Sequence, residues 1–281
     1  MAQPKPRMGR IEYLNVLPIY HALETGRVPH GYELVYGQPS ALNAMMQNGE
    51  LAVASTSSVE YARRPEKYWI LPDLAIGSYG TVLSVLLVSR CPVADLDGKT
   101  VLVSTATHTS VTLLKLLLKD HARVSVKFET GNTAEYLTMP DKPGAPAAML
   151  VIGDEALRSR NHPVYSHMWD LGEEWLAWTG LPFTFGLWVV SRDAAKRQGL
   201  AEDPAHVLHA GRDWSYANMD TLLAAAQERY PYSREALIEY FHCLSYKLGD
   251  LEQQGLRLFY DRLAAAGEIP KAPDLAFWPG I

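Results

Sequence analysis

Four times within its first 160 residues the chain shows one local order: a short aliphatic or β-branched run, a polar turn, and a segment with helical spacing. The four instances cover residues 9–24, 51–64, 100–119 and 148–160. This alternation predicts an α/β fold, in which helices cover a largely parallel sheet. Residues 39–48 predict one more helix, because Pro39 stands at its start and Gly49 directly after its end.

The last third of the chain, after about residue 191, carries helical periodicity without strand signals. One apolar stripe is formed by Leu222, Ala225 and Ala226. A second runs through Leu237, Tyr240, Phe241, Leu244 and Leu248. Residues 256–266 predict a third helix, closed by Gly267 and Pro270. We therefore expect a helical C-terminal region.

Two strongly apolar strand candidates, residues 81–89 and 185–191, bracket the middle of the chain. We interpret them as crossings between two lobes. Lobe one then comprises residues 1–89 and 190–281, lobe two comprises residues 90–189, and a cleft lies between them. The chain has no Gly/Ser-rich linker and no low-complexity tract, so we expect short strands rather than a tether to join the lobes.

Composition excludes several classes of protein. The formal charge is -5, so there is no basic excess for a nucleic-acid backbone. The apolar runs are far shorter than the roughly 20 residues that span a bilayer, and the N-terminus lacks a signal-peptide core. We expect a cytoplasmic protein with neither a nucleic-acid nor a membrane partner. The sequence leaves monomer and homodimer open.

Metal and cofactor motifs are missing from the sequence. Cys91 and Cys243 form neither a CxxC pair nor a disulfide framework. The nine histidines show no HExxH or HxH spacing, and there is no GxGxxG, Walker or GxSxG motif. We therefore expect no metal and no cofactor.

Polar turns follow the predicted strands, at the edge where open α/β sheets bind ligands. Helices that begin there present unpaired N–H groups and a positive dipole end, which favours a small anion. The turn at residues 105–110 is the strongest candidate, although Thr109 or Ser110 can equally be a helix cap. Asn15 can cap a helix or bind a substrate hydroxyl or carboxylate, whereas capping is favoured for Asp154.

Other polar and aromatic residues can be explained by helix capping or core packing as well as by a role at the site. Ser57 and Glu60 match a capping box, which explains Glu60 and leaves Ser58 to face the cleft. His21 and His108 lie near the turns, but a single histidine usually has a structural role. The aromatic residues at 175–188 can form a pocket wall for a planar ring or part of the core.

Seven short segments stand in a recognisable order. They are GRIEYLNVLP at 9–18, TSSVEY at 56–61, LPDLAI at 71–76, GTVLS at 80–84, TSV at 109–111, IGDEAL at 152–157 and WTGLPF at 178–183. Together they resemble the chorismate dehydratases of menaquinone synthesis, over about residues 9–260. The sister 1,4-dihydroxy-6-naphthoate synthases open with Ser-Pro-Cys-Pro-Asn-Asp, where this chain has Tyr-Leu-Asn-Val-Leu-Pro at 13–18.

The resemblance implies a periplasmic-binding-protein-like type II fold, with two α/β lobes, an interlobe cleft and a helical C-terminal region. It also implies a hydro-lyase of the futalosine pathway that converts chorismate to 3-[(1-carboxyvinyl)oxy]benzoate and water. It implies Asn15 and Ser84 as catalytic residues. The substrate-binding residues that it implies are Ser58, Thr109, Ser110, Gly153 and Asp154.

Such a dehydration removes the C3 hydrogen and the C4 hydroxyl of chorismate and leaves an aromatic ring. The C3 hydrogen is vinylogous to the ring carboxylate, and both departing groups lie on one face, which favours a stepwise elimination over a concerted anti pathway. The base can be the enolpyruvyl carboxylate of the substrate, Asp154 or His21. Two rival functions remain: the sister synthase, against which the opening segment speaks, and a small-anion solute-binding protein, against which the missing export signal speaks.

Overall fold

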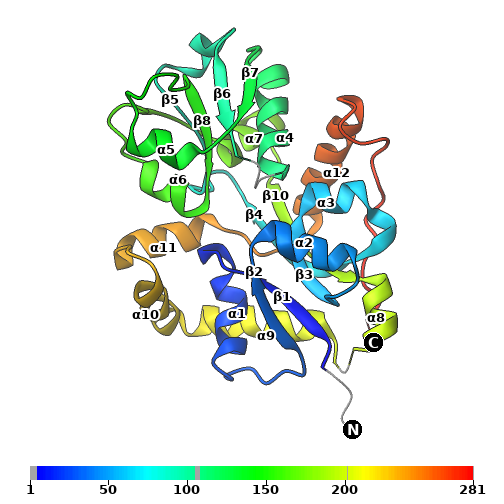
Figure 1. The fold of residues 1–281 in the computed structure, drawn as a ribbon. Coiled ribbons are helices and arrows are strands. Elements are labelled where there is room, and N and C mark those ends of the chain that lie inside the picture. Colours follow the sequence, from blue (N-terminus) through cyan, green and yellow to red (C-terminus); the bar gives the residue numbers. More distant parts are fainter. Residues whose placement is uncertain (1–4, 105–107, 201, 281) are drawn as a thin grey trace.

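The chain forms two five-stranded sheets, which lie in two bodies one above the other (Figure 1). The computed structural model describes residues 5–104, 108–200 and 202–280. The first sheet has the order β2-β1-β3-β10-β4, with β1 Arg7–Ile11, β2 Glu33–Gly37, β3 Val53–Ser57, β4 Tyr68–Ser78 and β10 Phe183–Ser191. The second has the order β7-β6-β8-β5-β9, with β5 Val85–Ser89, β6 Thr100–Val103, β7 Lys127–Thr130, β8 Ala148–Ile152 and β9 His167–Asp170.

The two sheets share one topology. Three neighbouring strands are parallel in each, β2-β1-β3 and β7-β6-β8. The next strand, β10 in the first sheet and β5 in the second, runs antiparallel to both of its neighbours. Each antiparallel strand follows directly after the chain has crossed from the other sheet. The predicted α/β class is confirmed by this arrangement.

The change of sheet does not fall at residues 89 and 190, where the apolar pattern placed the lobe boundaries. β5 already pairs in the second sheet and β10 already pairs in the first. The chain therefore changes sheet within residues 79–84 and within residues 171–182. β5 and β10 lie between two neighbours and are almost wholly buried, and strands covered on both faces have uninterrupted apolar runs. We propose that the lobe boundaries lie in these two segments.

Helices cover both sheets and form the C-terminal region. Those before β10 are α1 Leu17–Glu24, α2 Pro39–Gln47, α3 Ser58–Arg63, α4 His108–Leu116, α5 Thr133–Thr138, α6 Gly153–Ser159 and α7 Leu171–Thr179. After β10 follow α8 Arg192–Gln198, α9 Pro204–Ala217, α10 Met219–Arg229, α11 Arg234–Cys243 and α12 Asp250–Ala265. The predicted helical C-terminus is thus present. Leu244 and Leu248 are buried but lie beyond the end of α11, so the second predicted stripe is not all helix.

Local chemistry sets several helix ends as the sequence indicates. Ser57 caps α3, and its Oγ accepts a hydrogen bond of 3.1 Å from the backbone N–H of Glu60. Pro39 is the first residue of α2, and Gly49 follows the helix with a φ of 69°, in the region that glycine adopts without strain.

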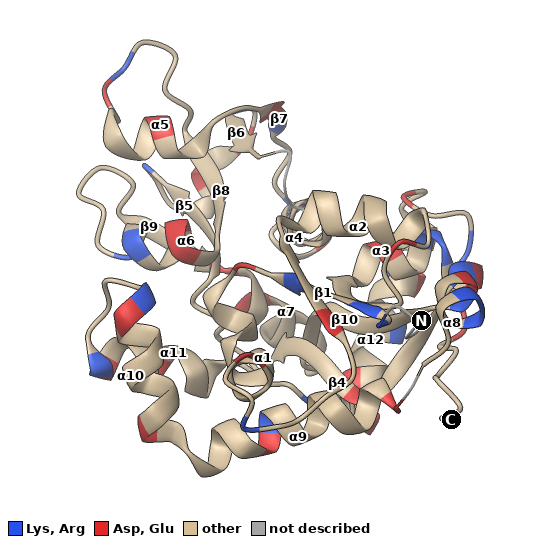
Figure 2. Ribbon diagram, turned by 60° about the horizontal axis from the view of Figure 1, so that its bottom comes forward, with Lys and Arg blue, Asp and Glu red and all other residues tan. Residues whose placement is uncertain are grey.

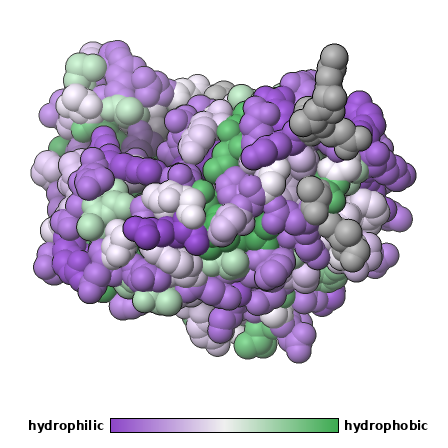
Figure 3. All heavy atoms as spheres, turned by 90° about the horizontal axis from the view of Figure 1, so that it is seen from below, coloured by the Kyte–Doolittle hydropathy of each residue, from purple (hydrophilic) through white to green (hydrophobic). Residues whose placement is uncertain are grey.

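Charged residues are concentrated at the periphery of the molecule. Figure 2 shows them on outer helices such as α8 and α10. Seen from below, the surface is mostly hydrophilic, with a band of hydrophobic residues near the middle of that face (Figure 3). Across the described ranges, every helix is too short or too polar to cross a membrane.

Candidate functional site

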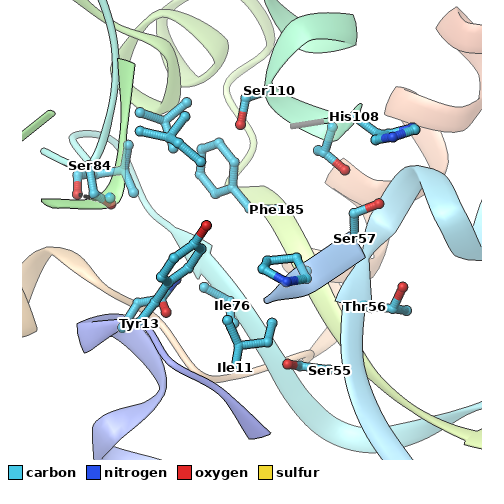
Figure 4. A pocket seen from close by; sticks show the side chains of 18 of the residues that line it. Ile11, Tyr13, Ser55, Thr56, Ser57, Ile76, Ser84, His108, Ser110 and Phe185 are labelled. Atoms are coloured by element: carbon cyan, nitrogen blue, oxygen red, sulfur yellow. Dashed lines mark hydrogen bonds between the residues drawn. The ribbon is translucent and has the colours of Figure 1, made fainter. Parts of the chain in front are cut away.

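A cavity of about 170 Å³ lies between the two sheets. The lower body contributes the ends of β1 and β3, the start of α2, and part of β10. The upper body contributes residues of the crossing segment after β4, the first turn of α4 and the start of α6. Figure 4 shows side chains from both bodies pointing into one space. The carboxyl ends of parallel strands therefore meet here, as they do at ligand sites of open α/β sheets.

Asn15 lines this cavity and does not cap a helix. It lies in a short 3-10 helix, Leu14–Val16, and neither that helix nor α1 has a side-chain cap. Its Oδ1 is buried and has no hydrogen-bond partner in the described part of the chain, and the same holds for the Oγ of Ser55. Buried polar atoms are normally paired, so these two oxygens are available to a ligand.

Ser84 and Gly153 lie together on the upper wall of the cavity. The backbone N–H of Gly153 donates to the carbonyl oxygen of Ser84 at 2.8 Å. Two residues just before Ser84, Val82 and Leu83, donate their N–H groups to the carboxylate of Asp170 at 2.8–3.1 Å. Leu83 has a φ of 61°, which few side chains tolerate, so the Asp170 contacts hold this segment in an unusual conformation.

Thr109 and Ser110 lie in the first turn of α4 and line the cavity. Because α4 begins at His108, neither is its cap; the preceding residues 105–107 of the predicted turn lie outside the described residues. Thr109 Oγ1 accepts a hydrogen bond of 3.3 Å from the N–H of Val59 and lies 3.4 Å from Ser58 Oγ. The first turn of α4 is thus joined to α3 across the two bodies.

Ser58 does not face the cavity, contrary to the prediction from the capping box. It is the first residue of α3 and is fully buried beneath Thr109, whereas its neighbour Ser57 lines the cavity. Ser57 is the last residue of β3, whereas Ser58 already belongs to α3, and its side chain turns toward Thr109 instead of the cavity.

The two protein groups considered as bases lie outside the cavity lining. Asp154 stands in the first turn of α6, two residues beyond its N-cap Ile152, and burial raises the pKa of its carboxyl while Arg158 opposes that shift. His21 is buried on α1 against Trp214, with ring centroids 5.8 Å apart. Its pKa is lowered, first by burial and then by the charge of Arg229. A separate surface groove beside α10 contains His21.

Most of the aromatic segment 175–188 belongs to the core. Trp175, Phe183 and Trp188 are essentially inaccessible, and Trp188 Nε1 donates to the buried Tyr20 hydroxyl at 3.0 Å. Phe185 is the only aromatic residue of this segment that lines the cavity. A second ring comes from Tyr13, after the end of β1.

Sequence reasoning missed the polar floor of the cavity. Ser55 and Thr56 line it from β3, and Thr56 Oγ1 donates to Asn43 Oδ1 on α2 at 2.9 Å. The signal was available as four successive hydroxyl residues, 55–58, directly after the apolar residues 51–54. Polar groups are rarely placed there unless something satisfies them.

The cavity is polar without being charged. Its described lining contains no Asp, Glu, Lys or Arg side chain. The N-termini of α2 and α4, each nine residues long, supply backbone N–H groups and positive dipole ends. Over the described residues, no group of three His, Cys, Asp or Glu side chains is placed to hold a metal ion. Such a lining suits a small anion with hydroxyl groups and a flat ring.

Comparison with known proteins gives a family and a fold. A family model described as menaquinone biosynthesis matches residues 6–265. The chorismate dehydratase of Thermus thermophilus is 27% identical over 97% of this chain and 98% of that protein. The 1,4-dihydroxy-6-naphthoate synthase of Streptomyces coelicolor is 28% identical over 93% and 94%. The aliphatic sulphonate binding protein SsuA from Escherichia coli superposes with a TM-score of 0.65 at 14% identity, covering 99% of this chain and 94% of that one. The predicted periplasmic-binding-protein-like fold is confirmed.

Proposed function

The chain belongs to the menaquinone biosynthesis family, and from that premise we propose that it is a chorismate dehydratase of the futalosine pathway. The reaction would convert chorismate to 3-[(1-carboxyvinyl)oxy]benzoate and water. The observation that carries this proposal is the uncharged, donor-rich cavity between the sheets. Chorismate has two carboxylates, a hydroxyl and a flat diene ring, and backbone N–H groups, hydroxyls and one or two aromatic rings complement those groups.

The cavity supports a stepwise elimination. Removal of the C3 hydrogen gives a carbanion that is delocalised into the ring carboxylate, and donors at a helix N-terminus would stabilise the growing charge. Neither Asp154 nor His21 lines the cavity, which favours the enolpyruvyl carboxylate of the substrate as the base. The protein would then supply orientation and charge stabilisation.

In this proposal each predicted site residue has a place. Asn15 and Ser84 act on the reacting part of the substrate from opposite walls. Thr109, Ser110 and Gly153 bind substrate from the upper body. Ser58 supports Thr109 from below, and Asp154 shapes the rim of the cleft without touching the reacting carbons.

Two rival functions use the same fold. Identities of 27% and 28% favour neither the dehydratase nor the sister synthase. The segment at residues 13–18 favours the dehydratase, because it places Asn15 with an unpaired oxygen on the cavity. A small-anion solute-binding protein would use a similar cavity but would release its ligand unchanged.

Incubation of the purified protein with chorismate tests the proposal. We expect the diene absorbance to fall while 3-[(1-carboxyvinyl)oxy]benzoate accumulates, at the same rate after exhaustive chelation. Chorismate that binds and raises the melting temperature without turning over would support the solute-binding function instead. Turnover of the synthase substrate to 1,4-dihydroxy-6-naphthoate, with chorismate left intact, would support the sister activity.

A further inference from the structure

Tyr13 places a phenol hydroxyl inside the cavity. It follows β1 in extended conformation and immediately precedes the 3-10 helix that carries Asn15. Its ring forms part of the cavity wall, and Figure 4 shows the hydroxyl pointing into the open space between Ser84 and Phe185. No described residue pairs with this hydroxyl. The phenol is therefore free to meet a bound substrate.

The proposed dehydration needs a proton donor at this place. The C4 oxygen would otherwise leave as hydroxide, a poor leaving group because it is strongly basic. A positioned acid typically contributes about 10²–10⁴-fold to such a step. Asn, Ser and Thr side chains stabilise charge by hydrogen bonding, but they do not give up a proton to a leaving group at neutral pH.

Only two side chains of the described cavity lining can titrate, Tyr13 and His108. The His108 ring is exposed, and its Nδ1 lies 2.9 Å from the guanidinium of Arg63 on α3. In Figure 4 that ring points away from the space that Tyr13 and Ser84 share. Position therefore favours Tyr13 as the donor.

The surroundings of Tyr13 keep its proton in place. The pKa of the Tyr13 hydroxyl is raised, mainly by burial and to a smaller extent by the nearby carboxylate of Asp154. The phenol is thus protonated at neutral pH. Hydroxide is still far more basic than phenolate, so transfer of the proton to the leaving oxygen is favourable.

We propose that Tyr13 is the general acid that protonates the departing C4 hydroxyl, an assignment that rests on the proposed function. After the enolpyruvyl carboxylate has taken the C3 proton, the C3 electron pair forms the C3–C4 double bond as the C4–O bond breaks. The Tyr13 O–H bond breaks in the same step and its proton completes the water molecule. The phenolate then regains a proton from the enolpyruvyl carboxylic acid, so the net reaction is chorismate to product and water.

The Tyr13→Phe variant tests this assignment. We expect its kcat on chorismate to fall about 10²–10⁴-fold, with KM within a few-fold of wild type, because the ring that lines the cavity is kept. Tyr230→Phe is the matched control: Tyr230 also lies beside Asp154 but does not line the cavity, and this variant should keep wild-type turnover. Circular dichroism and the melting temperature verify that both variants fold.

A second substrate distinguishes proton donation by Tyr13 from a role of Tyr13 in positioning the substrate. In a chorismate analogue with fluoride at C4 in the same configuration, the leaving group needs no proton. Tyr13→Phe should process this analogue within a few-fold of wild type. Equal losses on both substrates, or a variant within a few-fold of wild type on chorismate, would overturn the assignment. Wild-type protein that fails to dehydrate chorismate would instead refute the proposed function.

Discussion

The side-chain amide of Asn15 lies on the cavity and does not cap a helix. Because neither the 3-10 helix nor α1 uses it as a cap, Asn15→Asp should change the free energy of unfolding little. The substitution removes an amide donor and adds a negative charge beside an anionic substrate. We expect turnover of chorismate to fall about 10²–10³-fold, the usual cost of one lost donor to developing charge.

Asn48→Asp is the matched control for the added charge, because Asn48 is exposed at the end of α2 and outside the cavity lining. It should retain wild-type turnover. If Asn15→Asp folds normally and also turns over chorismate within a few-fold of wild type, the catalytic assignment of Asn15 is wrong.

At the residue scale, the sequence predicted local interactions between side chains and backbone better than it predicted which way a side chain points. The capping pair Ser57 and Glu60 could be read from spacing alone, because the interaction is local. Ser57 ends β3 and Ser58 begins α3, and the local sequence did not show which of these two side chains lies on the cavity. His21 lies near Asn15 in the sequence, but the helical turn of α1 points it into another groove.

At the scale of elements, Asp170 joins the segment that carries Ser84 to helix α7. Its carboxylate accepts four backbone N–H groups: those of Val82 and Leu83 in the crossing segment, and those of Gly172 and Glu173 in the first turn of α7. Asp170→Ala removes the cap and leaves buried donors unpaired. We expect a loss of about 2–4 kcal/mol in the free energy of unfolding, measured by urea denaturation.

Asp203→Ala is the control for a lost cap alone. Asp203 caps α9 and accepts the N–H of Ala205 at 2.9 Å, and among the described residues it makes no hydrogen bond to a second segment. Its loss should cost roughly 0.5–2 kcal/mol. Equal destabilisation by the two substitutions would show that Asp170 is only a helix cap and does not hold the Ser84 segment.

The bounds of several helices and strands follow from local sequence signals, whereas the strands with which they pair do not. Pro39 and Gly49 mark the ends of α2, and Gly267 marks the end of α12, but α12 starts at Asp250 and not at the predicted residue 256. β8 and α6 form the predicted strand, turn and helix within residues 148–160. The sheet to which β5 and β10 belong depends on hydrogen bonds between segments far apart in the chain. Apolar composition gives the burial of these strands but does not identify their neighbours.

At the scale of the whole molecule, contacts join the two bodies on both sides of the cavity. On one side Thr109 of α4 meets α3. On the other side the Arg160 guanidinium, just after α6, makes two contacts of 2.9 Å with the Glu239 carboxylate of α11. Figure 1 shows that α4 lies near α3 and α6 lies near α11, on opposite sides of the interface between the bodies. The two bodies are therefore in contact on both sides of the cavity, and we propose that they move apart, by bending within residues 79–84 and 171–182, to admit a ligand.

Small-angle scattering of the wild-type protein should show a smaller radius of gyration once 3-[(1-carboxyvinyl)oxy]benzoate saturates it, because donors from both bodies converge on one ligand. Arg160→Ala removes one partly exposed ion pair, worth about 0.2–1 kcal/mol. The product should then bind up to about five-fold more weakly, and the ligand-free protein should have a larger radius. Arg234→Ala breaks a similar pair with Asp220 inside one body and should leave both quantities unchanged. A wild-type radius that stays constant under verified saturation would contradict ligand-driven closure.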